Sequence, residues 1–391
     1  MAMQPRAGGH PGCFDDGRLL ILRGAIDARN ARLWMSGRII GRSMGRGAMQ
    51  VAILEQPRKF VVRERPVPRA EAGEVVVRIA ATAVCHTDLD MYLGHHPGVR
   101  YPVVLGHEAT GTIATVGADV SGLQPGQNVI INPVISCGRC DCCRRGDEHL
   151  CRNAGIIGRE FEGSLSQYIR LRARYVHPLP AHLPLAEATL IETLATVRHA
   201  QVRAGIAADE SVVVLGQGTT GLLHTRLAVL TGAKQVIAIS RTQWKIDLAT
   251  RMGARHTVRA SADEAVDKVQ RLTDGVGADV VIDTVGDAGT LRAGIDMLRP
   301  GGRFVSFSLG HADFSGLNAF GLYFKEISII GTRALTHVDM APSIELAASG
   351  KIDMSVFVTA RYPLDQVAAA FEEYECNPSR ILRIVIDAGA D

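Results

Sequence analysis

The chain has 391 residues, of which 47% are hydrophobic and 21% are charged, as in ordinary globular proteins. This composition excludes a disordered chain or a fibrous repeat, and the length predicts two or three domains of about 150 residues each. The net charge of +3 is too small to indicate nucleic-acid binding by itself.

Positive charge is concentrated in residues 1–48, where eight arginines and three aspartates give +5 and leave −2 for residues 49–391. We predict that residues 1–48 are either a disordered tail or the product of a start codon upstream of the true one, because Met49 opens a fresh apolar segment. A functional basic arm is the alternative. No stretch has the roughly 18 apolar residues of a membrane span, and no segment fits an export signal. A cytoplasmic location is therefore expected.

From residue 49 to about 180 the sequence reads as short alternating strands, for example at 74–79 and 128–131, which Gly and Pro interrupt. This pattern predicts antiparallel β structure. Residues 196–334 instead alternate apolar strands with helices, the order that produces a parallel sheet. The strands are expected at 211–215, 235–240, 278–283 and 303–307, and two of the helices at 219–230 and 242–252.

The last part of the chain, from residue 335, is expected to return to the first domain through a helix at 364–374 and a strand at 381–387. The predicted organisation is therefore one domain from 49–195 and 335–391, and a second domain from 196–334.

Gly216-Gln217-Gly218-Thr219-Thr220-Gly221 is a GxGxxG run that ends a strand and opens a helix, the context of a dinucleotide site. Gly216 permits the tight turn, Gly218 lets the backbone approach the pyrophosphate, and Gly221 lets helix and strand pack closely. Free N–H groups at the start of the helix, where Thr219 and Thr220 lie, are expected to bind the phosphates.

The end of the next strand selects the cofactor. NAD sites place an acid there to bind the ribose hydroxyls, but this chain has Ser240 and Arg241, with Lys245 one turn later. A hydroxyl and a guanidinium suit a 2′-phosphate, so NADP(H) is favoured over NAD(H). The alternative is that Arg241 is an ordinary surface residue.

Two groups of residues indicate zinc. Cys137, Cys140, Cys143 and Cys151 offer four thiolates from one loop, a closed set typical of a structural ion. Spacing favours Cys143 over the adjacent Cys142. A zinc-ribbon nucleic-acid reader is a weaker alternative, because the lobe lacks a recognition helix.

The second group is Cys85 and His107, mixed ligands that suit a catalytic zinc with an open position. Asp88 is placed to orient the imidazole of His107. Each residue alone would be read as a buried core side chain, but together with a nucleotide fold they favour a metal site.

These motifs, in this order, resemble the zinc-dependent medium-chain alcohol dehydrogenase family over residues 49–391; sorbitol and threonine dehydrogenases share some of the features. The resemblance implies an α/β fold in which a GroES-like, β-rich catalytic domain accompanies a Rossmann domain with a doubly wound parallel sheet. The active site would lie between the two domains, and a homodimer or homotetramer is expected.

Carried onto this chain, the resemblance makes Cys85 and His107 zinc ligands and favours Glu192 as the third, with Glu108 as an alternate ligand or close neighbour. It also implies that Thr87 hydrogen-bonds the substrate oxygen and that Thr196 contacts the nicotinamide. Arg383 matches an arginine that reaches the cofactor phosphates. Many members carry a histidine five residues after the zinc cysteine; this chain has Asp90, so the proton route beyond Thr87 stays open.

The function that follows is a zinc-dependent oxidoreductase that transfers a hydride between NADP(H) and an alcohol, a polyol or the corresponding carbonyl compound. Two zinc ions per chain are expected. An NAD-linked sorbitol- or threonine-type dehydrogenase is the nearer alternative, and a non-catalytic NADPH-binding regulatory protein is one of another class. A small-molecule substrate is expected, with no nucleic acid and no membrane as partner.

Overall fold

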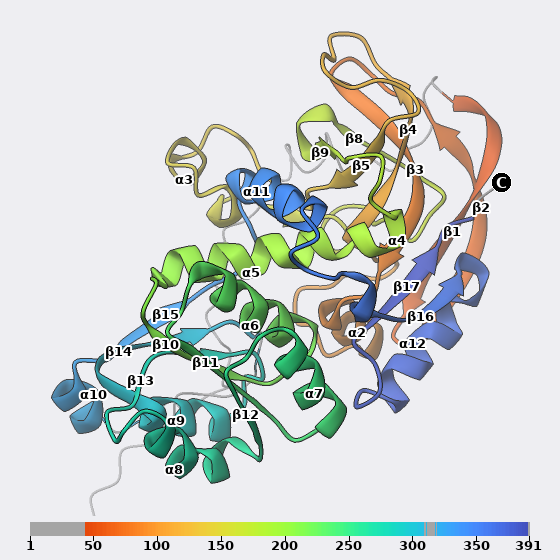
Figure 1. Ribbon diagram of the computed structural model, residues 1–391. Helices are drawn as coiled ribbons and strands as arrows, with labels where there is room; N and C mark the ends of the chain where they lie inside the picture. Colours follow the sequence, from red (N-terminus) through yellow and green to blue (C-terminus); the bar gives the residue numbers. More distant parts are fainter. Residues whose placement is uncertain (1–43, 309, 311–316, 318, 390–391) are drawn as a thin grey trace, which may run out of the picture.

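The computed structural model describes residues 44–308, 310, 317 and 319–389. The chain forms two halves, each built on one large sheet, with a long helix, α5 (Leu190–Ala204), running between them (Figure 1). Most of the basic N-terminal segment, residues 1–43, lies outside the described part, so the prediction made for it stays a prediction.

The first half contains a seven-stranded sheet in the order β16-β17-β3-β4-β5-β9. Strand β8 pairs with the first part of β3, on the same edge as β17 and opposite β4. All pairs except β16–β17 are antiparallel, as the alternating pattern predicts. The bounds are β3 Glu74–Ala83, β4 Glu108–Val116, β5 Asn128–Ile131, β8 Tyr168–Arg172, β9 Val176–Pro178, β16 Val358–Pro363 and β17 Arg383–Asp387.

A separate hairpin precedes this sheet. Strand β1 (Met44–Gln56) pairs with β2 (Lys59–Pro68). The strand starts five residues before the predicted start at Met49, because Met44 already pairs with Pro68 across a bulge. The apolar alternation on which the predicted start was based begins only at Met49, within the strand.

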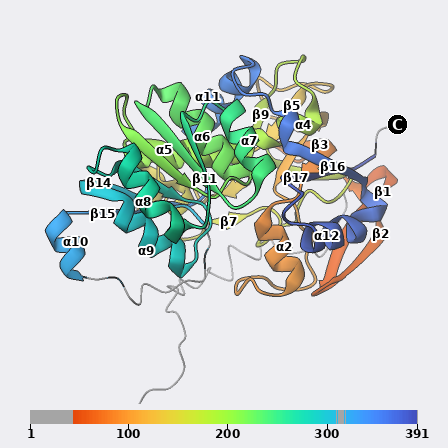
Figure 2. The ribbon, with the colours of Figure 1, turned by 60° about the horizontal axis from the view of Figure 1, so that its bottom comes forward.

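The C-terminal segment returns to the first half, as predicted. The helix expected at 364–374 begins as a 3-10 turn (Leu364–Gln366) and becomes α-helical only in α12 (Val367–Cys376). The final strand starts at Arg383 and not at residue 381, although Ile381 and Leu382 are buried. Strand β17 then pairs with β3, and α12 packs near α2 (His86–Leu93) in this half of the molecule (Figure 2).

The second half is a six-stranded sheet, ordered β12-β11-β10-β13-β14-β15, in which every pair is parallel. Alternate residues of β10 face opposite sides: Val212 and Val214 pack toward α5 and α6, and Val213 and Leu215 toward α8 and α9. Helices therefore cover both faces, which confirms the predicted doubly wound α/β fold.

The strands are β10 Ser211–Leu215, β11 Gln235–Ser240, β12 His256–Arg259, β13 Ala278–Asp283, β14 Leu298–Ser306 and β15 Ser328–Gly331. The helices are α6 Thr219–Thr231, α7 Gln243–Arg251, α8 Ala262–Leu272, α9 Ala288–Met297 and α10 Ala319–Lys325.

A shared apolar core joins the two halves. Helix α5 contributes buried residues on several of its turns, and α11 (His337–Ala348) packs along it. The same cluster contains Ile130 of the first sheet and Ala238 of the second. Helix α5 therefore fixes the two halves against each other over its length. In the described part of the chain, no helix is both long enough and apolar enough to cross a membrane.

One buried histidine makes stability depend on pH. His224 in α6 is fully buried, with its ring edge-on to Phe307 and its Nδ1 3.2 Å from Gln201 Nε2. Burial lowers the pKa of His224 to about 3. The unfolded chain, with an ordinary histidine pKa of about 6.5, therefore takes up this proton first. The stabilisation is complete above about pH 6.5 and is lost as the pH falls toward 3.

We expect the free energy of unfolding to fall by about 3 kcal/mol between pH 7 and pH 4.5 because of this group, since each pH unit below 6.5 is worth about 1.4 kcal/mol. Urea unfolding of His224→Leu at both pH values should show a smaller loss than wild type. His182→Leu, which removes an exposed histidine, should behave as wild type. An equal pH dependence in His224→Leu would contradict the assignment.

Candidate active site

Three side chains gather where α2 and β4 begin. Cys85 is the residue before α2, His107 immediately precedes β4, and Glu108 is its first residue. One ligand atom from each lies within 4.8 Å of the other two, and both His107 and Glu108 are buried. A sulfur, an imidazole nitrogen and a carboxylate oxygen form a donor set that fits zinc, and three protein ligands leave a fourth position for substrate.

Glu192, which the family resemblance favours as third ligand, lies outside this group of three. It is buried in the first turn of α5. Burial, with the negative charge of Glu108, raises the pKa of Glu192 to about 7. The geometry therefore favours Glu108 over Glu192 as ligand, because among the described residues Glu108, and not Glu192, has a ligand atom within 4.8 Å of those of both Cys85 and His107.

Asp88 holds the ligand loop together. Its carboxylate accepts hydrogen bonds from the backbone N–H of Cys85 (3.0 Å) and of Gly106 (3.2 Å), and Oδ1 lies 3.3 Å from Nδ1 of His107. Burial alone would lower the pKa of His107, but the Asp88 and Cys85 side chains raise it well above the ordinary value. Asp88 is therefore placed to orient the imidazole, as the sequence predicts.

Arg383, the first residue of β17, is buried against the same cluster. Its Nη2 lies 3.0 Å from Glu108 Oε1 and donates to Thr193 Oγ1 at 3.1 Å, while Nη1 donates to the Val84 carbonyl at 3.2 Å. The sequence did not indicate this ion pair, since no local pattern links two residues so far apart. The contact of Arg383 with cofactor phosphates stays a prediction.

The other residues predicted to act on substrate or nicotinamide lie on α2 and α5. Thr87 Oγ1 is 3.9 Å from Cys85 Sγ, at the metal-ligand group. Asp90, one turn later on the same face of α2, has Oδ1 3.8 Å from His86 Nε2. Thr196 on α5 donates its hydroxyl to the Glu192 carbonyl at 3.2 Å.

The GxGxxG loop lies between β10 and α6, as predicted. Gly216 has φ +84°, and a Cβ at Gly221 would lie 2.0 Å from the Gly216 carbonyl oxygen. By contrast, a Cβ at Gly218 would meet nothing within 4 Å, which leaves room for a ligand at that backbone. The side-chain hydroxyl of Thr219 already donates a hydrogen bond to the Leu382 carbonyl at 2.8 Å. Thr220 is half-buried beside it.

The residues expected to select the cofactor lie at the end of β11 and just after it. Ser240 is its last residue, and its Oγ accepts from the Thr242 N–H at 3.3 Å. Arg241 is exposed and has no ion-pair partner among the described residues. Lys245 donates to the Pro378 carbonyl at 3.2 Å, and burial lowers its pKa. Arg241 is thus the free cation at this position, while Lys245 is tied to the C-terminal segment.

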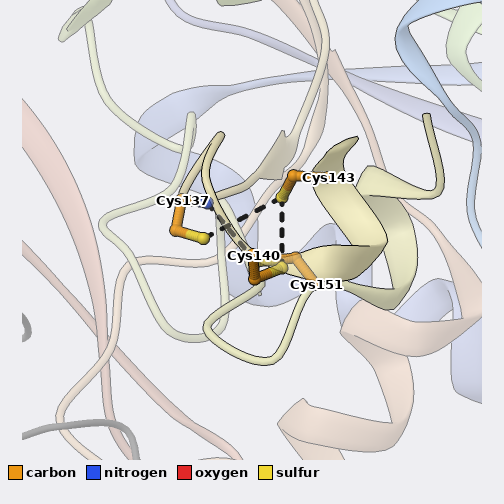
Figure 3. Close-up of side chains that lie close together, drawn as sticks. All are labelled: Cys137, Cys140, Cys143 and Cys151. Carbon is orange, nitrogen blue, oxygen red and sulfur yellow. Dashed lines mark hydrogen bonds between the residues drawn. The ribbon is translucent and has the colours of Figure 1, made fainter. Parts of the chain in front are cut away.

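The four-cysteine lobe lies around the short helix α3 (Asp141–Arg144). The side chains of Cys137, Cys140, Cys143 and Cys151 converge, with one sulfur from each within 4.8 Å of the others (Figure 3). Cys143 Sγ lies 3.5 Å from Cys140 Sγ and 3.9 Å from Cys137 Sγ. Cys142 is outside this group of four, with its sulfur 3.7 Å from Arg145 Nη2. Four sulfurs at this spacing suit tetrahedral zinc with no open position.

Comparison with known proteins agrees with this geometry. The "Alcohol dehydrogenase GroES-like domain" model matches residues 71–181, and the "Zinc-binding dehydrogenase" model matches residues 219–349. A sorbitol dehydrogenase from Halalkalibacterium halodurans is 32% identical over 84% of this chain and 96% of its own length.

Two solved structures show the same architecture with a bound cofactor. A putative zinc-binding dehydrogenase from Sinorhizobium meliloti 1021, bound to NADP, has a TM-score of 0.80 and 28% identity, covering 88% of this chain and all of the other. An alcohol dehydrogenase from Escherichia coli CFT073, complexed with NADH, has a TM-score of 0.79 and 25% identity, covering 87% and 99%. Sequence, fold and site together place this chain in the zinc-dependent medium-chain alcohol dehydrogenase family, as an oxidoreductase of the alcohol and polyol type.

Proposed function

We propose that this chain oxidises a polyol, or reduces the corresponding carbonyl compound, with NADP(H) as the preferred cofactor and two zinc ions per chain. The observation that carries the proposal is the group Cys85, His107 and Glu108, which offers three ligands of a catalytic ion. A polyol is favoured as substrate because the similar protein from Halalkalibacterium halodurans is a sorbitol dehydrogenase.

Zinc held by Cys85, His107 and Glu108 would act as a Lewis acid that lowers the pKa of a substrate alcohol. The protein residues do the positioning. Asp88 orients His107, and Arg383 holds the Glu108 carboxylate at 3.0 Å. The Thr87 hydroxyl, beside Cys85, is placed to hydrogen-bond the reacting substrate oxygen and to take its proton toward Asp90.

The preference for NADP(H) rests on Arg241, an exposed guanidinium that directly follows β11 where NAD sites place an acid. NAD is the second candidate, since the similar alcohol dehydrogenase from Escherichia coli CFT073 is complexed with NADH. A reducing compartment and a homodimer or homotetramer also belong to the proposal. The arrangement of five cysteines as metal ligands, with none of the seven described cysteines in a disulfide, supports the first of these.

The Arg241→Asp variant tests the cofactor assignment. An aspartate removes a charge-assisted hydrogen bond and repels the 2′-phosphate, so we expect kcat/KM for NADPH to fall by about 10²- to 10³-fold, with a gain for NADH. Arg255→Asp, on an arginine whose guanidinium donates to the Lys234 carbonyl, is the control. If the ratio of the two kcat/KM values stays as in wild type, Arg241 does not select the cofactor and the NAD-linked alternative holds.

A further inference from the structure

One side chain of the dinucleotide motif makes its hydrogen bond to the other half of the molecule. Thr219 is the first residue of α6, inside the GxGxxG run, and it is buried. Its hydroxyl donates to the carbonyl of Leu382, 163 positions later in the chain. Leu382 belongs to the C-terminal segment that returns to the catalytic half, so this hydrogen bond joins the two halves at the cofactor loop.

The cofactor phosphates do not need the Thr219 hydroxyl. The residue before α6 is Gly218, and no side chain caps the start of the helix. The first N–H groups of a helix have no partner within it, so those of α6 can donate to phosphate oxygens whatever side chain stands at position 219. The reason for a hydroxyl at this position therefore lies at the other end of its hydrogen bond.

The residue that follows Leu382 is Arg383, and its side chain contacts both parts of the metal-ligand group. Its Nη2 lies 3.0 Å from Glu108 Oε1. Its Nη1 donates at 3.2 Å to the carbonyl of Val84, the residue before Cys85. Both Leu382 and Arg383 are buried. The backbone that Thr219 holds is therefore one peptide unit away from the side chain that fixes Glu108.

Glu108 has one carboxylate oxygen fixed and one free. Arg383 engages Oε1, whereas Oε2 is buried and has no hydrogen-bond partner among the described residues. A buried carboxylate oxygen without a donor suits a metal ligand, because a cation supplies the missing partner. A shift of Arg383 would carry Oε1 with it and turn Oε2 away from its place in the metal-ligand group.

We propose that Thr219 is a positioning residue for the metal-ligand group. Its hydroxyl holds the backbone at Leu382, and thereby the Arg383 guanidinium on Glu108, in a fixed place relative to the cofactor loop. The inference rests on the proposed function, since it requires a metal ion at the metal-ligand group. It goes beyond that function by assigning a side chain of the dinucleotide motif to the metal site and not to the cofactor.

The test compares Thr219→Val, which removes the hydroxyl and keeps the shape, with Thr219→Ser, which keeps the hydroxyl. Cobalt(II) in place of zinc gives each variant an absorption spectrum that depends on the ligands of the ion. The closed four-cysteine lobe contributes the same bands to every variant, so differences between the spectra report the catalytic ion. We expect Thr219→Val to change this spectrum and Thr219→Ser to restore it.

Kinetics and cofactor binding separate the two ends of the hydrogen bond. Thr219→Val should lower kcat by about 10- to 10²-fold, because small misplacements of reacting groups cost this much. Its Kd for NADP⁺ should stay within about threefold of wild type, because the backbone N–H groups at the start of α6 remain. Thr231→Val is the matched control, since the hydroxyl of the exposed Thr231 donates to the Leu227 carbonyl within the same helix. It should match wild type in spectrum and kcat.

A wild-type cobalt spectrum in Thr219→Val, or a changed spectrum that Thr219→Ser does not restore, overturns the inference. So does a Kd for NADP⁺ raised by about tenfold or more with an unchanged spectrum, because the hydroxyl would then serve the cofactor. Thr219→Ala gives the same comparison if Thr219→Val does not fold.

Hydrogen–deuterium exchange on the purified protein gives a readout that needs no metal. Thr219→Val should speed exchange in peptides covering residues 105–108 and 382–387 by about tenfold or more, and Thr219→Ser should not. A wild-type chain that binds only one cobalt ion would contradict the proposed function. Faster exchange in Thr219→Val alone would then still support the positioning of Glu108 by Thr219, and equal exchange in all variants would overturn it.

Discussion

Replacing Cys85 with serine should lower kcat by about 10³-fold or more and reduce the zinc content from two ions per chain to one. The reason is that Cys85 is the only sulfur in the group with His107 and Glu108. Lewis-acid stabilisation of a developing alkoxide is worth several kcal/mol, and each 1.4 kcal/mol corresponds to a tenfold change in rate. Metal analysis and steady-state kinetics on the same preparation measure both effects.

Cys376→Ser is the matched control, since Cys376 is exposed and lies outside the metal-ligand groups of the described residues. It should keep both ions and full activity. Turnover at wild-type rate in Cys85→Ser would remove the zinc mechanism, and two ions retained in that variant would move the catalytic ion to other ligands.

The same assay separates the two glutamates. Glu108→Gln should lose the catalytic ion, because Glu108 lies within 4.8 Å of both other ligands. Glu192→Gln should retain it, because Glu192 lies outside the group of three. The opposite pattern of metal content would restore Glu192 as third ligand.

Cys143→Ser should remove the other ion and destabilise the protein, whereas Cys142→Ser should do neither. The two residues are adjacent, but only the sulfur of Cys143 lies among the group of four. A structural zinc contributes its binding free energy directly to the folded state. We expect Cys143→Ser to lower Tm by about 5 °C or more, because about 1 kcal/mol shifts Tm by about 2–4 °C in domains of 150–250 residues.

Calorimetric melting and zinc analysis of the two variants give a direct comparison. If Cys142→Ser loses zinc and stability while Cys143→Ser does not, the assignment of the fourth sulfur is wrong. Equal stability of both variants and wild type would show that the lobe needs no metal.

Features determined by neighbouring residues could be predicted from the sequence. The glycines at 216, 218 and 221 act within a single turn, and the structure gives each the spatial setting that the motif requires. The spacing of the four thiols likewise identified Cys143. Short-range chemistry of this kind depends little on how the rest of the chain packs.

Features that depend on packing between distant segments could not be predicted. The pair Glu108–Arg383 and the exclusion of Glu192 from the group of three both depend on where β17 and α5 lie against β4. The start of β1 at Met44 was missed because Gly45, Arg46 and Gly47 carry no apolar alternation.

The order of the chain also has a consequence for biosynthesis. Strand β3 can pair with β17 only after the end of the chain has been synthesised. The buried Arg383 likewise donates to the carbonyl of Val84, 299 positions earlier in the chain. During translation the nucleotide-binding half emerges complete, while the catalytic sheet still lacks β17 and Glu108 still lacks its buried counter-ion. In nascent chains arrested before Arg383, the Rossmann half should therefore resist protease, whereas the metal-ligand loop should still be cleaved. The catalytic centre would be the last part of the enzyme to mature on the ribosome.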